Sequence, residues 1–135
     1  MIRMEVIQKS NSPYGSPVVL IKKKDNTVRF CVDFRGLNEV TIKENFPMPF
    51  IDEELESFHG MKYFTTIDLT CGYWQFLVDE NAKKYTAFNT PQGSYEFNRM
   101  PFGLCNAGAT FQRAMQELLD DLEFARSLVS FLKLT

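Results

Sequence analysis

Two apolar runs near the start of the chain predict a β-hairpin. Residues 17–23 (PVVLIKK) and 28–34 (VRFCVDF) are rich in β-branched and aromatic side chains. Residues 24–27 (KDNT) join them, and Asp and Asn favour turns because both tolerate left-handed backbone conformations. The pattern therefore predicts a hairpin with lysines near its tip.

Apolar residues at helical spacing predict two helices. Ile51, Leu55 and Phe58 recur on one helical face, and Gly60 suits the C-terminal end of that helix. The clearest helix runs from about residue 107 to 123, with Asn106 as its expected N-cap. Its apolar stripe consists of Phe111, Met115, Leu118, Leu119 and Leu122.

Other segments have the composition of strands. These are residues 62–69, a hairpin formed by 84–90 and 94–98 around Pro91-Gln92-Gly93, and a final strand at 128–134. Hairpin, helix, strand, hairpin, helix and strand in this order indicate an α+β fold with a largely antiparallel sheet. No repeat or low-complexity linker divides the chain, so we expect a single domain or a fragment of a larger one.

Composition excludes several classes of protein. The 14% aromatic content, with 13 Phe, argues against intrinsic disorder. No apolar run approaches the ~20 residues that span a membrane, and the N-terminus lacks a signal-peptide pattern. The 3 cysteines fit neither a disulfide framework nor a zinc motif, so we expect reduced thiols inside the cell, in the cytoplasm or nucleus.

Charge is unevenly distributed along the chain. The net charge is −2, but residues 1–45 carry eight basic and five acidic residues, a net of +3. Residues 46–135 carry seven basic and twelve acidic residues, a net of −5. A cationic first third attracts phosphate locally, because charges are screened over ~10 Å. The alternative is a solvated, lysine-rich hairpin tip.

Three segments carry residues of the types that catalysis or ligand binding requires. Asp68 ends an apolar strand before a glycine turn, where a carboxylate can hold a divalent cation and free amides can meet phosphate; the alternative is an Asp that caps the turn. Residues 99–106 form either a wall for a base or sugar or a Pro/Gly turn. Residues 22–24 (KKK) with Arg29 form a possible triphosphate clamp. The one histidine, His59, fits a helix end better than a catalytic role.

Together these segments resemble the reverse transcriptase of gypsy-like LTR retrotransposons. The resemblance covers about residues 8–124 and is carried by SPYGSPVVLIKKKDNTVRFCVDFRGLNEVTIKENFPMPFIDE, KYFTTIDLTCGYWQF and KKYTAFNTPQGSYEFNRMPFGLCNAGATFQRAM, in the family's order. It implies a partial right-hand polymerase fold in which about residues 1–60 belong to the fingers, about residues 61–135 belong to the palm, and the thumb is absent.

The resemblance also implies a site. Asp68 matches the catalytic aspartate that ligates two Mg²⁺ ions, with the Leu69 carbonyl assisting, and the implied partners are a dNTP and an RNA/DNA primer–template. The residues implied to bind the nucleotide are Lys23 and Arg29 at the triphosphate, the Cys71 and Gly72 amides at phosphate oxygens, Tyr73 as the gate against a ribose 2′-hydroxyl, and Phe102 and Gly103 as the wall for sugar and base.

A second pair of catalytic aspartates is missing from the sequence. The family carries them in a Tyr-x-Asp-Asp turn after the long helix, whereas no carboxylate follows Glu123 here. Asp120 and Asp121 come too early and fall within the predicted helix. We therefore expect this chain alone to be inactive, with its last strand an exposed edge that invites self-association. The alternative is a non-catalytic, retroelement-derived remnant that binds nucleic acid or a partner subunit weakly.

Overall fold

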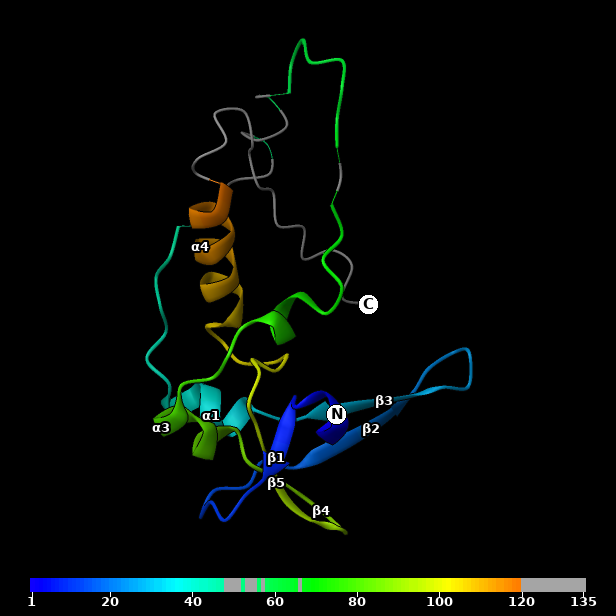
Figure 1. Ribbon diagram of the computed structural model, residues 1–135, viewed down its shortest axis with the longest axis vertical. Coiled ribbons are helices and arrows are strands. Elements are labelled where there is room, and N and C mark those ends of the chain that lie inside the picture. Colours follow the sequence, from blue (N-terminus) through cyan, green and yellow to red (C-terminus); the bar gives the residue numbers. More distant parts are fainter. Residues whose placement is uncertain (48–51, 53–55, 57, 66, 120–135) are drawn as a thin grey trace. The chain divides into compact units, whose positions relative to one another are not determined.

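The structure, a computed structural model, describes residues 1–47, 52, 56, 58–65 and 67–119 (Figure 1). The chain divides into two compact units, of which the first is Met1–Lys43 with Thr70–Ala107 and the second is Glu44–Leu69 with Gly108–Thr135. The described elements are, in chain order, the 3₁₀ helix η1 (Ile2–Met4), β1 (Ile7–Lys9), β2 (Val18–Lys22), β3 (Val28–Val32), α1 (Arg35–Val40), η2 (Gly72–Gln75), α3 (Glu80–Lys83), η3 (Lys84–Thr86), β4 (Phe88–Thr90), β5 (Gly93–Phe97) and α4 (Ala107–Leu119).

The predicted N-terminal hairpin is confirmed. Strands β2 and β3 pair antiparallel, with Ile21 opposite Arg29, and lie side by side in Figure 1. The amide of Lys23 extends the ladder by donating to the Thr27 carbonyl at 2.8 Å. Asn26 takes a φ of 61°, which is the left-handed turn conformation that its residue type tolerates.

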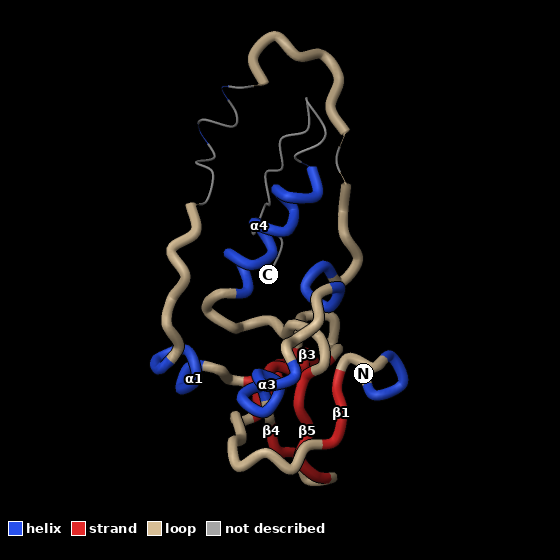
Figure 2. The backbone as a smooth tube through the Cα atoms, turned by 60° about the vertical axis from the view of Figure 1, so that its left-hand side comes forward, coloured by secondary structure: helices blue, strands red, loops and turns tan. Residues whose placement is uncertain are grey.

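A three-stranded antiparallel sheet in the order β1-β5-β4 forms the rest of the first unit's framework (Figure 2). The sequence analysis missed β1, because three residues are too few to show a period. The prediction of a strand from residue 84 was wrong in part, since β4 begins only at Phe88. The Thr86 hydroxyl accepts a bond from the Phe97 amide at 2.9 Å and donates to the Lys83 carbonyl at 2.7 Å. The Thr86 side chain thus supplies the acceptor that a backbone carbonyl would supply if β4 extended to this residue.

Phe88 is at the centre of the hydrophobic core of the first unit. Its side chain is 1% exposed, and its ring lies 5.5 Å from that of Phe30 and 5.3 Å from that of Phe97. The other buried members of this core are Val6, Ile7 and Phe34. The core therefore joins the hairpin to the three-stranded sheet, and the predicted α+β class is confirmed.

The second unit departs from the expectations in one place. Residues 62–69 were predicted as a strand, but the described part of this segment has no regular structure. Tyr63 is 94% exposed and Ile67 is 75% exposed. A strand needs a hydrogen-bonded neighbour, and no described segment pairs with this one.

The predicted helices agree with the structure where residues are described. Helix α4 follows the expected stripe as far as Leu119, and Gly60 takes a φ of +81°, as expected after a helix. Most of the helix predicted before Gly60, the strand at 128–134 with its proposed self-association, and Asp120 and Asp121 lie outside the described residues. In the described part of the chain, no helix has both the length and the apolar character to cross a bilayer.

Candidate functional site

Strand register decides which of the hairpin's cations can act together. Side chains alternate between the two faces of a strand. Arg29 lies opposite Ile21, and the Lys23–Thr27 backbone bond continues this register. Lys23 and Arg29 therefore share one face, whereas Lys22 belongs to the other and Lys24 lies in the turn. Lys23 is exposed and Arg29 half-buried.

A left-handed residue starts the turn that carries Tyr73. Cys71 adopts a φ of 52° and a ψ of 44°, and η2 follows directly. The Trp74 amide donates to the Cys71 carbonyl at 2.8 Å, which closes the turn. Cys71 is exposed and Gly72 half-buried. The short helix continues into residues that pair with a later segment, since the Met100 amide donates to the Phe76 carbonyl at 2.9 Å.

This pairing brings together two of the predicted site residues. The rings of Tyr73 and Phe102 lie with centroids 5.0 Å apart, tilted by 42°. Burial raises the pKa of the Tyr73 phenol above its ordinary value of 10.0. Phe102 remains 40% exposed. Aromatic pairs at this distance are attractive, so the two rings form one apolar surface that remains partly exposed.

The loop after Phe102 lies against the end of β3 and the start of α1. Gly103 has a φ of +96°, a conformation that is costly for residues with a Cβ. A Cβ at this position would lie 3.6 Å from the Phe34 ring and 3.9 Å from the Val32 carbonyl oxygen. Asn38, in α1, bonds to this loop through both ends of its side-chain amide. Sequence reasoning missed Asn38, because nothing in its local pattern reveals a contact with a distant loop.

The predicted metal ligands belong to the other compact unit. Asp68 is exposed and Leu69 is 37% exposed. Within the described ranges, no group of three or more His, Cys, Asp or Glu residues is arranged to hold a metal ion. Of the predicted site residues, the structure brings Tyr73 and Phe102 into contact and places Lys23 and Arg29 on the same face of the hairpin.

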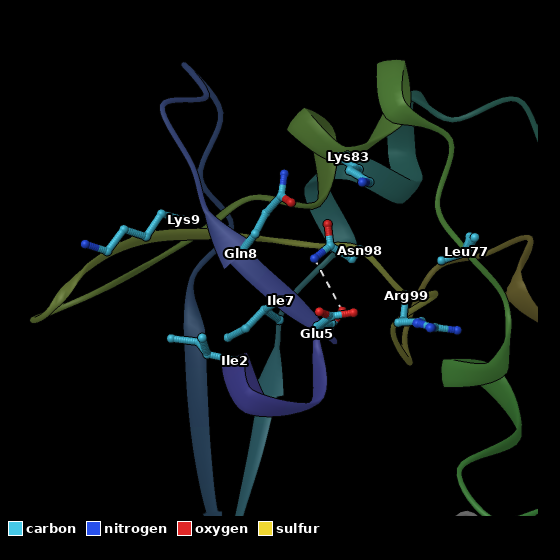
Figure 3. Close-up of a pocket in the computed structure, with 9 residues that line it drawn as sticks. All are labelled: Ile2, Glu5, Ile7, Gln8, Lys9, Leu77, Lys83, Asn98 and Arg99. Carbon is cyan, nitrogen blue, oxygen red and sulfur yellow. Dashed lines mark hydrogen bonds between the residues drawn. The ribbon is translucent and has the colours of Figure 1, made fainter.

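A separate hollow of about 600 Å³ lies beside β1, and of the candidate segments only residues 99–106 reach its lining, through Arg99 (Figure 3). The Asn98 side chain at its wall donates to the Glu5 carbonyl at 3.3 Å. Arg99 also lines it and donates to the Trp74 carbonyl at 3.5 Å. The remaining lining residues are Ile2, Ile7, Gln8, Lys9, Leu77 and Lys83. Arg99 thus links the lining of this hollow to η2, the short helix that bears Tyr73.

Comparison with known proteins gives one consistent result. The family model described as "Reverse transcriptase (RNA-dependent DNA polymerase)" matches residues 21–132. The Retrovirus-related Pol polyprotein from transposon 297 of Drosophila melanogaster is 46% identical over 127 residues, covering 90% of this chain and 12% of the relative. That from transposon gypsy of the same organism is 41% identical, covering 88% of this chain and 12% of the relative. The chain thus spans about an eighth of the length of these relatives.

Solved structures of a viral enzyme share the fold. The protease-reverse transcriptase of Prototype Foamy Virus matches with a TM-score of 0.78 and 26% identity, covering 96% of this chain and 17% of that one. The foamy viral enzyme in complex with an RNA/DNA hybrid matches with a TM-score of 0.79 and 20% identity, covering 96% of this chain and 17% of that one.

Proposed function

Because this chain belongs to the reverse transcriptase family, we propose that it provides the fingers and the first part of the palm of a retrotransposon polymerase. The reaction is RNA-templated addition of deoxynucleotides to a primer. Identity with Drosophila retrotransposon polyproteins supports the retrotransposon origin. The RNA/DNA hybrid bound by the similar foamy viral enzyme supports nucleic acid as the partner.

The observation that carries this proposal is the contact between Tyr73 and Phe102. Two segments far apart in sequence bring together an apolar surface that stays partly open to solvent. A turn-capping role for either segment would not require that surface. Its apolar face suits the sugar and base of a nucleotide, and we assign Tyr73 to the exclusion of a ribose 2′-hydroxyl. Gly103 permits the turn that follows Phe102, because its φ of +96° is costly for a residue with a Cβ.

The triphosphate is assigned to two cations and two amides. Lys23 and Arg29 share one hairpin face, which supports joint contact with a polyanion. The amides of Cys71 and Gly72, at a left-handed residue that opens a short helix, form the kind of concave turn that accepts phosphate oxygens. These contacts bind and orient the nucleotide.

When bound, the divalent metal ions that this family uses would supply the Lewis acidity that activates a primer hydroxyl and the positive charge that neutralises the leaving pyrophosphate. The described residues offer the Asp68 carboxylate and the Leu69 carbonyl as oxygen donors. Two octahedral Mg²⁺ ions need more donors than these. We therefore propose that Asp68 is a metal ligand and that the 135-residue polypeptide by itself does not catalyse primer extension.

The binding half of this proposal is tested with matched charge reversals. Lys23→Glu should weaken dATP binding by about tenfold to a hundredfold, because a charged hydrogen bond to phosphate contributes roughly 1.5–3 kcal/mol. Lys43→Glu makes the same charge change at another exposed lysine of the same unit and should change the Kd by less than about twofold. Fluorescence of Trp74, the single tryptophan, reports binding. Equal losses in both variants would show only non-specific attraction.

The catalytic half is tested by primer extension on an RNA template with Mg²⁺. We expect no incorporation that depends on Asp68 when the natural polypeptide is compared with Asp68→Ala. Incorporation that this substitution abolishes would show that the chain completes its own metal site. Absence of nucleotide binding as well as of extension would favour the non-catalytic remnant.

A further inference from the structure

The side-chain amide of Asn38 ties the loop at residues 101–105 to α1. Its Nδ2 donates to the Gly103 carbonyl at 2.8 Å, and its Oδ1 accepts from the Cys105 amide at 2.8 Å. An amide that both donates and accepts in this way uses each end of the group, so it fixes the position and the direction of the loop backbone.

Asn38 is itself placed by the core. Its backbone amide donates to the Phe34 carbonyl at 2.8 Å, and Phe34 is only 2% exposed. Packing in the core is thus transmitted through α1 and the Asn38 amide to the loop. Phe102 precedes Gly103 in this loop, and its ring contacts Tyr73. The position of the aromatic surface therefore depends on the two bonds made by Asn38.

We propose, on the basis of the nucleotide-binding role above, that Asn38 is a positioning residue for sugar discrimination, because its amide holds the Phe102 loop against Tyr73. A steric gate rejects a 2′-hydroxyl only if the opposite wall does not yield. A shift of about 1 Å at such a wall is enough to relax a close fit. Asn38 does not contact the nucleotide in this proposal; it acts through the loop backbone.

The test compares nucleotide affinities in four versions of the chain. These are the natural sequence, Asn38→Ala, Asn38→Asp and the control Asn11→Ala, at an exposed asparagine of the same unit. Each is titrated with dATP and with ATP in the presence of Mg²⁺, and the Trp74 fluorescence is followed. In the natural chain we expect dATP to bind more tightly, on the order of tenfold, as for other steric differences of this size.

Asn38→Ala should bring the ATP-to-dATP ratio of Kd values close to one. Asn38→Asp keeps the acceptor for the Cys105 amide but cannot donate to Gly103, so its ratio should be intermediate. Asn11→Ala should keep the natural ratio. A purely structural role for Asn38 would weaken both nucleotides equally and leave the ratio unchanged, and that result would overturn the proposal. If the alanine variant does not fold, as judged by circular dichroism, the aspartate variant decides the comparison.

The phenol titration of Tyr73 separates failure of this role from failure of the proposed function. The chain has 5 tyrosines, so the titration of Tyr73 is obtained by subtracting the titration curve of the same protein with Tyr73→Phe added. If Asn38 holds the ring pair, Asn38→Ala should lower the pKa of Tyr73 toward its ordinary value of 10.0. An unchanged pKa would refute the link between Asn38 and the rings. A lowered pKa with no dATP preference in the natural chain would instead refute the proposed function, and with it sugar discrimination by Asn38.

Discussion

Replacing Gly103 by alanine tests the geometry of the candidate site most directly. The φ of +96° at this residue lies in a region that residues with a Cβ rarely occupy. The new Cβ would lie 3.6 Å from the Phe34 ring, an ordinary contact, so steric overlap adds little. The expected cost is therefore backbone strain, roughly 1–3 kcal/mol. It is reduced by about 0.4–1 kcal/mol because alanine restricts the unfolded chain.

Gly36 offers a matched control in the same unit. It lies in α1, its φ is not positive, and a Cβ would meet nothing within 4 Å. Gly36→Ala should stabilise the protein by about 0.5–1 kcal/mol, because alanine is the better helix former. Gly103→Ala should destabilise it by roughly 1–2 kcal/mol after both contributions are combined. The same chemical change thus has opposite signs at two positions.

Urea denaturation followed by Trp74 fluorescence measures both free energies of unfolding. The free energies of unfolding of the two variants should differ by about 1.5–3 kcal/mol. Gly103→Ala should also weaken dATP binding, because Phe102 is displaced from Tyr73. If Gly103→Ala proves as stable as Gly36→Ala, the left-handed conformation of this loop is wrong.

Three further predictions follow from the described contacts. Thr86→Val should lower the free energy of unfolding by about 2–4 kcal/mol, because the buried Phe97 amide loses its acceptor, whereas Thr86→Ser should lower it by only about 1 kcal/mol. Urea denaturation that finds the serine variant less stable than the valine variant would contradict this. Burial raises the folded pKa of Tyr73, so the stability that this residue contributes is complete below the ordinary phenol pKa of 10.0 and is lost as pH rises through the folded value. Tyr73→Phe should flatten the alkaline decline in unfolding free energy, and an unchanged decline would count against this burial. Filter binding of an RNA/DNA hybrid should weaken steeply with salt, by a slope of about −0.7 to −0.9 per phosphate contact, and salt-independent binding would exclude phosphate contact as its source.

Local pattern accounts for the elements that the sequence predicted correctly. The β2–β3 hairpin follows from two β-rich runs around an Asp-Asn turn, and Asn26 takes the left-handed conformation expected of its residue type. The apolar stripe of α4 likewise follows from helical periodicity. Each of these features depends on residues close together in the chain.

Local pattern failed where an element depends on distant partners. Residues 62–69 have strand composition but no described neighbour to pair with, and β1 is too short to be recognised without β5. Thr86 interrupts the expected strand because its hydroxyl bonds to Phe97. Strand propensity describes a side chain that fits a sheet, whereas the sheet itself must come from elsewhere in the chain.

The sequence by itself determined the family and the short-range elements, because motif order and periodicity are properties of neighbouring residues. Only the tertiary structure decided that Tyr73 lies against Phe102, that Lys23 and Arg29 share a face, and that the Asn38 side chain bonds to the loop at residues 101–105. Such contacts arise when a core closes around a residue such as Phe88, and packing, unlike periodicity, has no signature in a single segment of sequence.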